Sequence, residues 1–130
     1  MIGYVTLGTN DLERARRFYE QLLAEIGARR LLEFPDARGY TMYGRSGREP
    51  MLAITRPIDG NPATAGNGTM VALPMPSREQ VDRFHAKALE LGAADEGAPG
   101  VRGPEEMGFY GAYFRDPDGN KLCAFHITRN

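Results

Sequence analysis

The chain has 130 residues, 42% of them hydrophobic, which is enough to bury the core of one compact domain, or of two half-size modules sharing a core, without disulfide staples. Its 16 basic and 17 acidic residues are interspersed and give a formal net charge of −1, so the composition excludes the electropositive surface of a nucleic-acid-binding protein. The single cysteine, with no signal-like leader and no apolar run long enough to cross a bilayer, predicts a soluble cytoplasmic protein that enters no membrane.

The first half of the chain predicts a strand, a helix and three further strands. Residues 1–8 alternate as a half-buried strand does. Apolar side chains then recur at helical spacing over residues 11–26, where Asn10 or Asp11 can cap the helix and Gly27 can end it. The three short strand candidates that follow are 28–34, 39–43 and 51–56.

The second half repeats this order after a stretch rich in Gly, Pro and Asn. Residues 57–68 have no periodicity, which indicates a linker or a long surface loop. The pattern then restarts with a strand at 69–73 and a helix at 77–91 that Ser77 can cap. A weak strand at 93–98 and a flexible-looking loop at 99–104 come next.

The restart also shows in residue identities. An offset of 66 residues lays Tyr4 on Met70 and brings several identical residues into register, among them Phe18 with Phe84. Two unrelated amphipathic helices would share apolar positions by chance, so a coincidental match is the alternative. The repeat interpretation predicts two related modules.

The C-terminal stretch Phe109–Ile127 predicts a β-hairpin. Two runs rich in aromatic and branched residues flank Asp-Pro-Asp-Gly-Asn at 116–120, in which Pro117 supplies a fixed φ and Gly119 a positive φ. This hairpin, with Arg-Asp-Pro-Asp-Gly-Asn at its turn, closely resembles the last hairpin of the glyoxalase / bleomycin-resistance / extradiol-dioxygenase group, the vicinal oxygen chelate superfamily.

The resemblance extends over nearly the whole chain and implies an α+β fold. In that fold two βαβββ modules form an open eight-stranded mixed sheet whose concave side holds the binding pocket. Here the first module is expected at 1–57 and the second at 69–130, with 58–68 as the linker. Proteins of this size in the family commonly pair, so the resemblance also implies a homodimer.

Enzymes of the family hold a metal ion on side chains from the first, fourth, fifth and eighth strands. The positions that match the first, fifth and eighth strands carry Tyr4, Met70 and Cys123, and the fourth-strand candidates lie within 51–55. These side chains do not form the carboxylate and imidazole set that hard divalent ions or zinc require. We therefore expect no metal and no other cofactor. A copper(I) site of Met70 and Cys123 is the alternative on ligand type.

Strand geometry limits what the candidate side chains can do. Cys123 and His126 are three residues apart on one strand, so they face opposite ways and cannot form a dyad, and Cys123 is better read as a small buried side chain. Tyr110 and Tyr113 also face opposite ways, so at most one of them lines a pocket by simple alternation. The predicted ligand-pocket residues are Tyr4, Met70, Tyr110, Tyr113, Cys123 and Phe125.

We therefore expect a glyoxalase-like or bleomycin-resistance-like protein that binds a small organic ligand in a metal-free pocket, with no catalytic residue assigned. One alternative is an enzyme of the same superfamily: a metal-dependent lyase, isomerase or dioxygenase with non-standard ligands, or metal-free acid–base catalysis by Tyr4 with a loop carboxylate such as Glu105 or Glu106. The other is a partner subunit whose pocket is packed shut by Tyr4, Met70 and Phe125.

Overall fold

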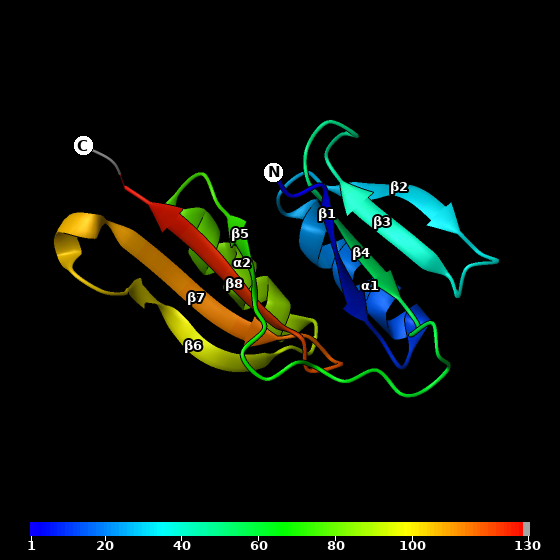
Figure 1. Ribbon diagram of the computed structural model, residues 1–130. Helices are drawn as coiled ribbons and strands as arrows, with labels where there is room; N and C mark the ends of the chain where they lie inside the picture. The colour runs from blue at the N-terminus through cyan, green and yellow to red at the C-terminus, as the bar shows by residue number, and fades with distance from the viewer. Residues whose placement is uncertain (129–130) are drawn as a thin grey trace. The chain divides into compact units, whose positions relative to one another are not determined.

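The computed structural model describes residues 1–128, so the last two residues of the predicted second module lie outside the described residues. The chain divides into two compact units, Met1–Gly66 and a second that begins at Asn67. Each unit is a four-stranded sheet with one α-helix packed on it (Figure 1).

The first unit runs strand, helix and three strands. Its sheet has the order β1-β4-β3-β2, with β1 parallel to β4 and the other neighbours antiparallel. The elements are β1 (Tyr4–Gly8), α1 (Leu12–Ala24), β2 (Arg29–Phe34), β3 (Tyr40–Gly44) and β4 (Met51–Thr55).

The second unit repeats this plan, with β5 parallel to β8 in the order β5-β8-β7-β6. A short 3₁₀ turn, η1 (Glu105–Met107), is inserted before the last two strands. The other elements are β5 (Val71–Pro74), α2 (Arg78–Glu90), β6 (Ala94–Val101), β7 (Phe109–Arg115) and β8 (Lys121–Ile127).

The predicted α+β fold of two βαβββ modules is confirmed. Arg78 and Glu90, the first and last residues of α2, each lie 66 residues after their counterparts Leu12 and Ala24 in α1, as the repeat interpretation requires. One detail differs. The eight strands form two separate four-stranded hydrogen-bonded sheets rather than one continuous sheet.

Both helices begin at a side-chain cap. Asp11 accepts a hydrogen bond from the backbone N–H of Arg14, and Ser77 accepts one from that of Gln80. Asp11 is thus the cap of α1, and the other candidate, Asn10, has a different role. Its side-chain amide exchanges two hydrogen bonds with the backbone of Ala63, in the segment that follows β4.

The sixth strand is longer than the sequence predicts. The expected loop at 99–104 continues as strand as far as Val101, which pairs with Tyr110 on β7. Pro99 has no N–H to give to a ladder, which favours a loop in the sequence, but β6 is an edge strand with a neighbour on one side only. Register shifts between Asp95 and Gly100 absorb the irregular pairing.

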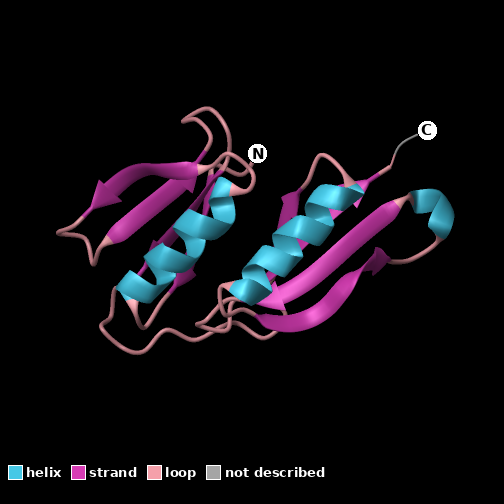
Figure 2. Ribbon diagram, turned by 180° about the vertical axis from the view of Figure 1, so that it is seen from behind, coloured by secondary structure: helices cyan, strands magenta, loops and turns pink. Residues whose placement is uncertain are grey.

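Each helix covers one face of its own sheet (Figure 2). In the first unit Tyr43 of β3 is buried against α1 and donates a hydrogen bond to Glu20. In the second unit the rings of Phe84 on α2 and Phe114 on β7 lie 6.1 Å apart. We call the opposite side of each sheet its helix-free face. Within the described part of the chain, no helix is long and apolar enough to cross a membrane.

Candidate functional site

The turn of the last hairpin is built around the buried carboxylate of Asp116. Its Oδ1 accepts hydrogen bonds from the backbone N–H groups of Asp118 and Asn120, at 2.9 Å each, and its Oδ2 accepts one from the Asn120 side chain. Gly119 has the positive φ that the turn needs, at 92°. The turn fixes the pairing of β7 with β8, in which Tyr113 lies opposite Cys123.

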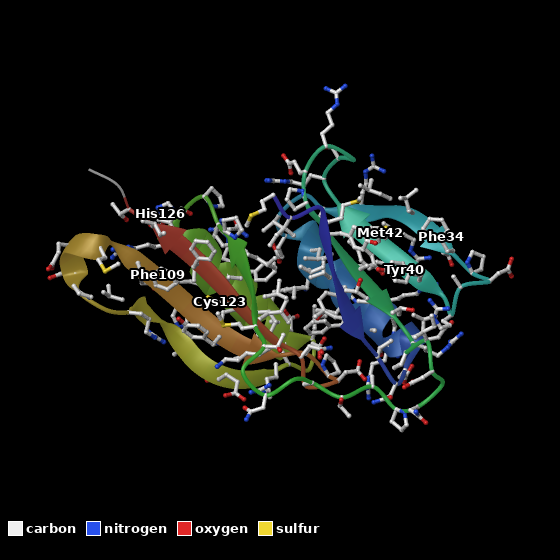
Figure 3. The ribbon with its side chains drawn as sticks, viewed as in Figure 1. Phe34, Tyr40, Met42, Phe109, Cys123 and His126 are labelled. Atoms are coloured by element: carbon white, nitrogen blue, oxygen red, sulfur yellow. The ribbon has the colours of Figure 1, made fainter. Side chains whose placement is uncertain are left out.

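The helix-free face of the second unit is aromatic around this pair. Phe125 follows Cys123 on the same face of β8, and its ring stacks on that of Phe109 from β7 with centroids 5.5 Å apart and planes 6° from parallel. Tyr113 stands on the same face of β7 as Phe109. Cys123 and Phe109 are labelled on neighbouring strands of this face in Figure 3.

Cys123 is only 1% exposed, and burial raises the pKa of its thiol. The Tyr113 hydroxyl interacts with this thiol, while desolvation, and then the neighbouring Cys123, raise the pKa of Tyr113. A neutral, enclosed thiol is a poor nucleophile because the reactive form is the thiolate. His126 gives it no base, because it faces the other side of β8, where its Nδ1 donates to the backbone carbonyl of Met75.

The two other candidates of this unit lie apart from Cys123. The Tyr110 hydroxyl donates to Asp82 of α2 at 2.6 Å, and the guanidinium of Arg78 lies over its ring, so Tyr110 belongs to the face that the helix covers. The hydrogen bond to Asp82 is the main reason why its pKa is raised. Met70 precedes β5 and is 44% exposed.

In the first unit, Tyr4 stands on the helix-free face of β1 and is 56% exposed. Thr6, two residues along the strand, hydrogen-bonds through its hydroxyl to that of Tyr40 on β3, and the Tyr40 ring lies 6.5 Å from that of Phe34 on β2. Met42 follows Tyr40 on the same face of β3 (Figure 3).

Sequence reasoning missed the group formed by Phe34, Tyr40 and Met42. The alternation of Tyr40, Thr41 and Met42 in a strand was a usable signal, but it does not tell which side the helix will cover. Arg16 of α1 decides this, because its guanidinium donates to the hydroxyl of Thr41. The loop acids Glu105 and Glu106 are exposed in η1.

The donor chemistry does not fit a resident divalent metal. Among residues 1–128, no three His, Cys, Asp or Glu side chains come close enough together to hold an ion. Both histidines have other partners: His85 contacts Asp95 at 3.1 Å, and His126 contacts the Met75 carbonyl at 2.9 Å. Tyr4, Met70 and Cys123 bring no carboxylate or imidazole, which magnesium, manganese and iron(II) prefer.

Comparisons with known proteins agree with this architecture. A family model described as the Glyoxalase/Bleomycin resistance protein/Dioxygenase superfamily matches residues 1–124. A comparison with curated proteins gives no significant match. Among solved structures, a glyoxalase/bleomycin resistance protein from Albidiferax ferrireducens T118 is 38% identical, with a TM-score of 0.84 over 97% of this chain and 98% of that chain.

Two more distant structures share the fold. One is a family enzyme from Burkholderia phytofirmans PsJN, 18% identical with a TM-score of 0.72 over 97% of this chain and 98% of that chain. The other is TnmS3, an antibiotic binding protein from Streptomyces sp. CB03234, 23% identical with a TM-score of 0.67 over 98% of this chain and 96% of that chain. The family match, the similarity to the Albidiferax protein and the repeated βαβββ units together show that the chain belongs to the Glyoxalase/Bleomycin resistance protein/Dioxygenase superfamily.

Proposed function

We propose that this protein binds a small organic ligand on the helix-free face of a sheet, without the help of a metal ion. The observation that carries the proposal is the environment of Cys123. The family resemblance implies a metal-binding glutamate at this position, and the chain has instead a buried thiol, kept neutral by its surroundings, next to Tyr113. An aromatic, weakly polar surface of this kind suits an organic molecule better than a hydrated ion.

We assign one candidate ligand-binding surface to each unit, and the two surfaces use most of the side chains that the sequence singles out. The surface of the second unit comprises Tyr113, Cys123 and Phe125, with Phe109 added by its stacking on Phe125. Met70 directly precedes β5 of the same unit and remains a further candidate. The surface of the first unit comprises Tyr4 together with Phe34, Tyr40 and Met42. Tyr110 is left out because it faces α2.

A ligand-binding role has a parallel among the proteins that share this fold. TnmS3 is described as an antibiotic binding protein. At 23% identity that likeness supports the fold and leaves the ligand of this chain open. We further propose that the protein acts as a cytoplasmic homodimer, with 58–68 as the linker between the modules, as the family resemblance suggests.

Native mass spectrometry of the gently purified protein tests the proposal, because one spectrum reports subunit number, bound metal and organic adducts. The expected result is a dimer that carries no stoichiometric metal ion, bare or with an organic adduct whose mass gives the first ligand to test. A stoichiometric divalent ion, retained after dialysis against a chelator, would contradict the metal-free proposal and favour the enzyme alternative.

A further inference from the structure

We propose that the helix-free face of the second unit binds the carboxylate of a small aromatic acid between Arg102 and Lys121, with the ring of the acid lying against Phe109 and Phe125. This inference rests on the proposed function and names the chemical class of its ligand. It depends on the charges of Arg102 and Lys121 beside Tyr113. Neither of these two residues was a candidate in the sequence.

Two cations converge on one ring. The guanidinium carbon of Arg102 and the Nζ of Lys121 each lie 5.5 Å from the centroid of the Tyr113 ring. Cation–π attraction of this kind supplies about 0.5–1 kcal/mol at exposed sites, which holds a side chain in place but does not neutralise its charge. The surface above Cys123 is therefore positively charged.

Neither cation has an acidic partner among the described residues. Arginine and lysine side chains that do form ion pairs there include Arg16, Arg30, Arg45, Lys87 and Arg115. The nearest of them in the strand register is Arg115, opposite Lys121, and Glu96 already neutralises it. Two unneutralised cations beside one aromatic ring favour an anion, and an added carboxylate would gain charge-assisted hydrogen bonds from both.

Arg102 is held in advance by the shape of β6. A Cβ at Gly100 would lie 2.8 Å from its Nη1, and one at Gly97 would lie 3.3 Å from its Nη2, so the guanidinium occupies space that only glycine leaves open. Its Nη2 donates to the backbone carbonyl of Ala98, and its Nη1 reaches that of Val101 at 3.4 Å. A guanidinium has five N–H groups, so donors remain for a ligand.

The apolar part of the site continues from the same ring. Gly111, opposite Phe125 in the β7–β8 pairing, lies between Tyr113 and the stacked phenylalanines. A Cβ at Gly111 would lie 2.7 Å from Cε1 of Phe109 and 3.5 Å from the Tyr113 hydroxyl. One continuous strip thus has a cationic end and an aromatic end. An aromatic carboxylate matches both ends, whereas a neutral ligand leaves the two charges without a partner.

The experiment compares an acid with its uncharged amide. The probes are 2-naphthoate and 2-naphthamide, titrated into the ¹⁵N-labelled full chain and followed by NMR. The variants Arg102→Gln and Lys121→Gln each remove one charge from the site. Gly100→Ala keeps every charge but displaces the guanidinium, and Arg83→Gln removes one charge from the exposed side of α2, on the other face of the same sheet.

We expect 2-naphthoate to bind about 10- to 100-fold more tightly than the amide, which is the scale of two charge-assisted hydrogen bonds. Three variants should each weaken the affinity for the acid by about tenfold and change the affinity for the amide by less than about twofold: Arg102→Gln, Lys121→Gln and Gly100→Ala. Arg83→Gln should leave the affinities for the acid and for the amide unchanged. The shifts should lie at Phe109, Tyr113 and Phe125.

Equal affinity for acid and amide would overturn the inference but leave the proposed function standing, because an uncharged ligand would still be bound. Equal losses from Arg83→Gln and Arg102→Gln would overturn it too, since the effect would then be one of net charge. If neither probe shifts the second unit, the inference fails, and an organic adduct in the native mass spectrum would still support ligand binding. Well-dispersed amide spectra confirm that each variant is folded.

Discussion

Cys123 shows how one side chain changes what a site can do. Its side chain is buried on the helix-free face of the second sheet, and burial raises the pKa of the thiol. The pKa of Tyr113, directly opposite on β7, is also raised, because the loss of solvent disfavours the charged phenolate as it does the thiolate. The pair therefore offers a ligand neutral, weakly polar groups across the usual range of pH.

The raised pKa of Cys123 predicts a loss of stability on the alkaline side. An unfolded cysteine titrates at about pH 8.5, and the native thiol titrates higher, so the native state favours the protonated form. The stabilisation is fully present below the pKa of the unfolded thiol and is lost as pH rises through the native pKa. Urea unfolding of the wild type and of Cys123→Ala at a series of pH values measures this.

We expect the difference in unfolding free energy between the two proteins to shrink as pH rises above about 8.5. Cys123 also raises the pKa of Tyr113, so the comparison is read between about pH 8 and 9, below the range in which an unfolded tyrosine titrates. A difference that stays constant or grows with pH would mean that burial of Cys123 does not disfavour its thiolate.

At the scale of elements, the hairpin of β7 and β8 carries most of the proposed site, and its register depends on the turn between the strands. A slip of one residue would move every side chain of the slipped strand to the other face, so that Ala112 or Phe114 would replace Tyr113 opposite Cys123. Asp116 specifies the register from inside the turn, through its bonds to the backbone of Asp118 and Asn120.

Asp116→Ala should therefore lower the unfolding free energy by roughly 2 kcal/mol, because it leaves two backbone N–H groups without the carboxylate that accepts from them. Asp36→Ala, at an exposed position in the turn between β2 and β3, is the matched control and should cost less than about 0.5 kcal/mol. Urea denaturation of the wild type and the two variants measures these differences in unfolding free energy. Similar losses in both variants would show that the Asp116 carboxylate does not stabilise the turn.

At the scale of the whole molecule, the segment that follows β4 is less free than its composition indicates. It is rich in Gly, Pro and Asn, yet Ala63 exchanges two hydrogen bonds with the Asn10 side chain, at 2.6 and 3.1 Å. A Cβ at Gly8 would lie 3.0 Å from that of Ala63, so the segment also passes close to the end of β1. It is tied to the first unit just before the chain enters the second.

Asn10→Ala should release this segment and raise the rate of limited proteolysis within residues 58–68 several-fold, with α1 still capped by Asp11. Asn67→Ala, an exposed loop substitution beyond the contact, is the control and should cleave at the wild-type rate. Mass spectrometry of the first fragments gives site and rate. Unchanged cleavage of Asn10→Ala would mean that these bonds do not restrain the segment.

The amino-acid sequence alone predicts the repeated order of strand and helix, the position of the last hairpin, and the shortage of metal-binding side chains. These follow from local periodicity, turn chemistry and composition, which need no knowledge of distant partners. The bounds of the helices in both units and the turn around Asp116 agree with the prediction from the sequence. Membership of the superfamily was likewise apparent from the hairpin and the repeat, and the family match over residues 1–124 confirms it.

The face of the sheet on which each side chain lies, relative to the helix, became known from the folded structure. Alternation separates Tyr110 from Tyr113 but does not tell which of them the helix covers, and the bond from Tyr110 to Asp82 on α2 settles that. The length of β6 depended on its place at the sheet edge, where Pro99 is tolerated. The position of Arg102 against Tyr113 depended on the space above Gly97 and Gly100, which exists only once β6 and β7 are paired.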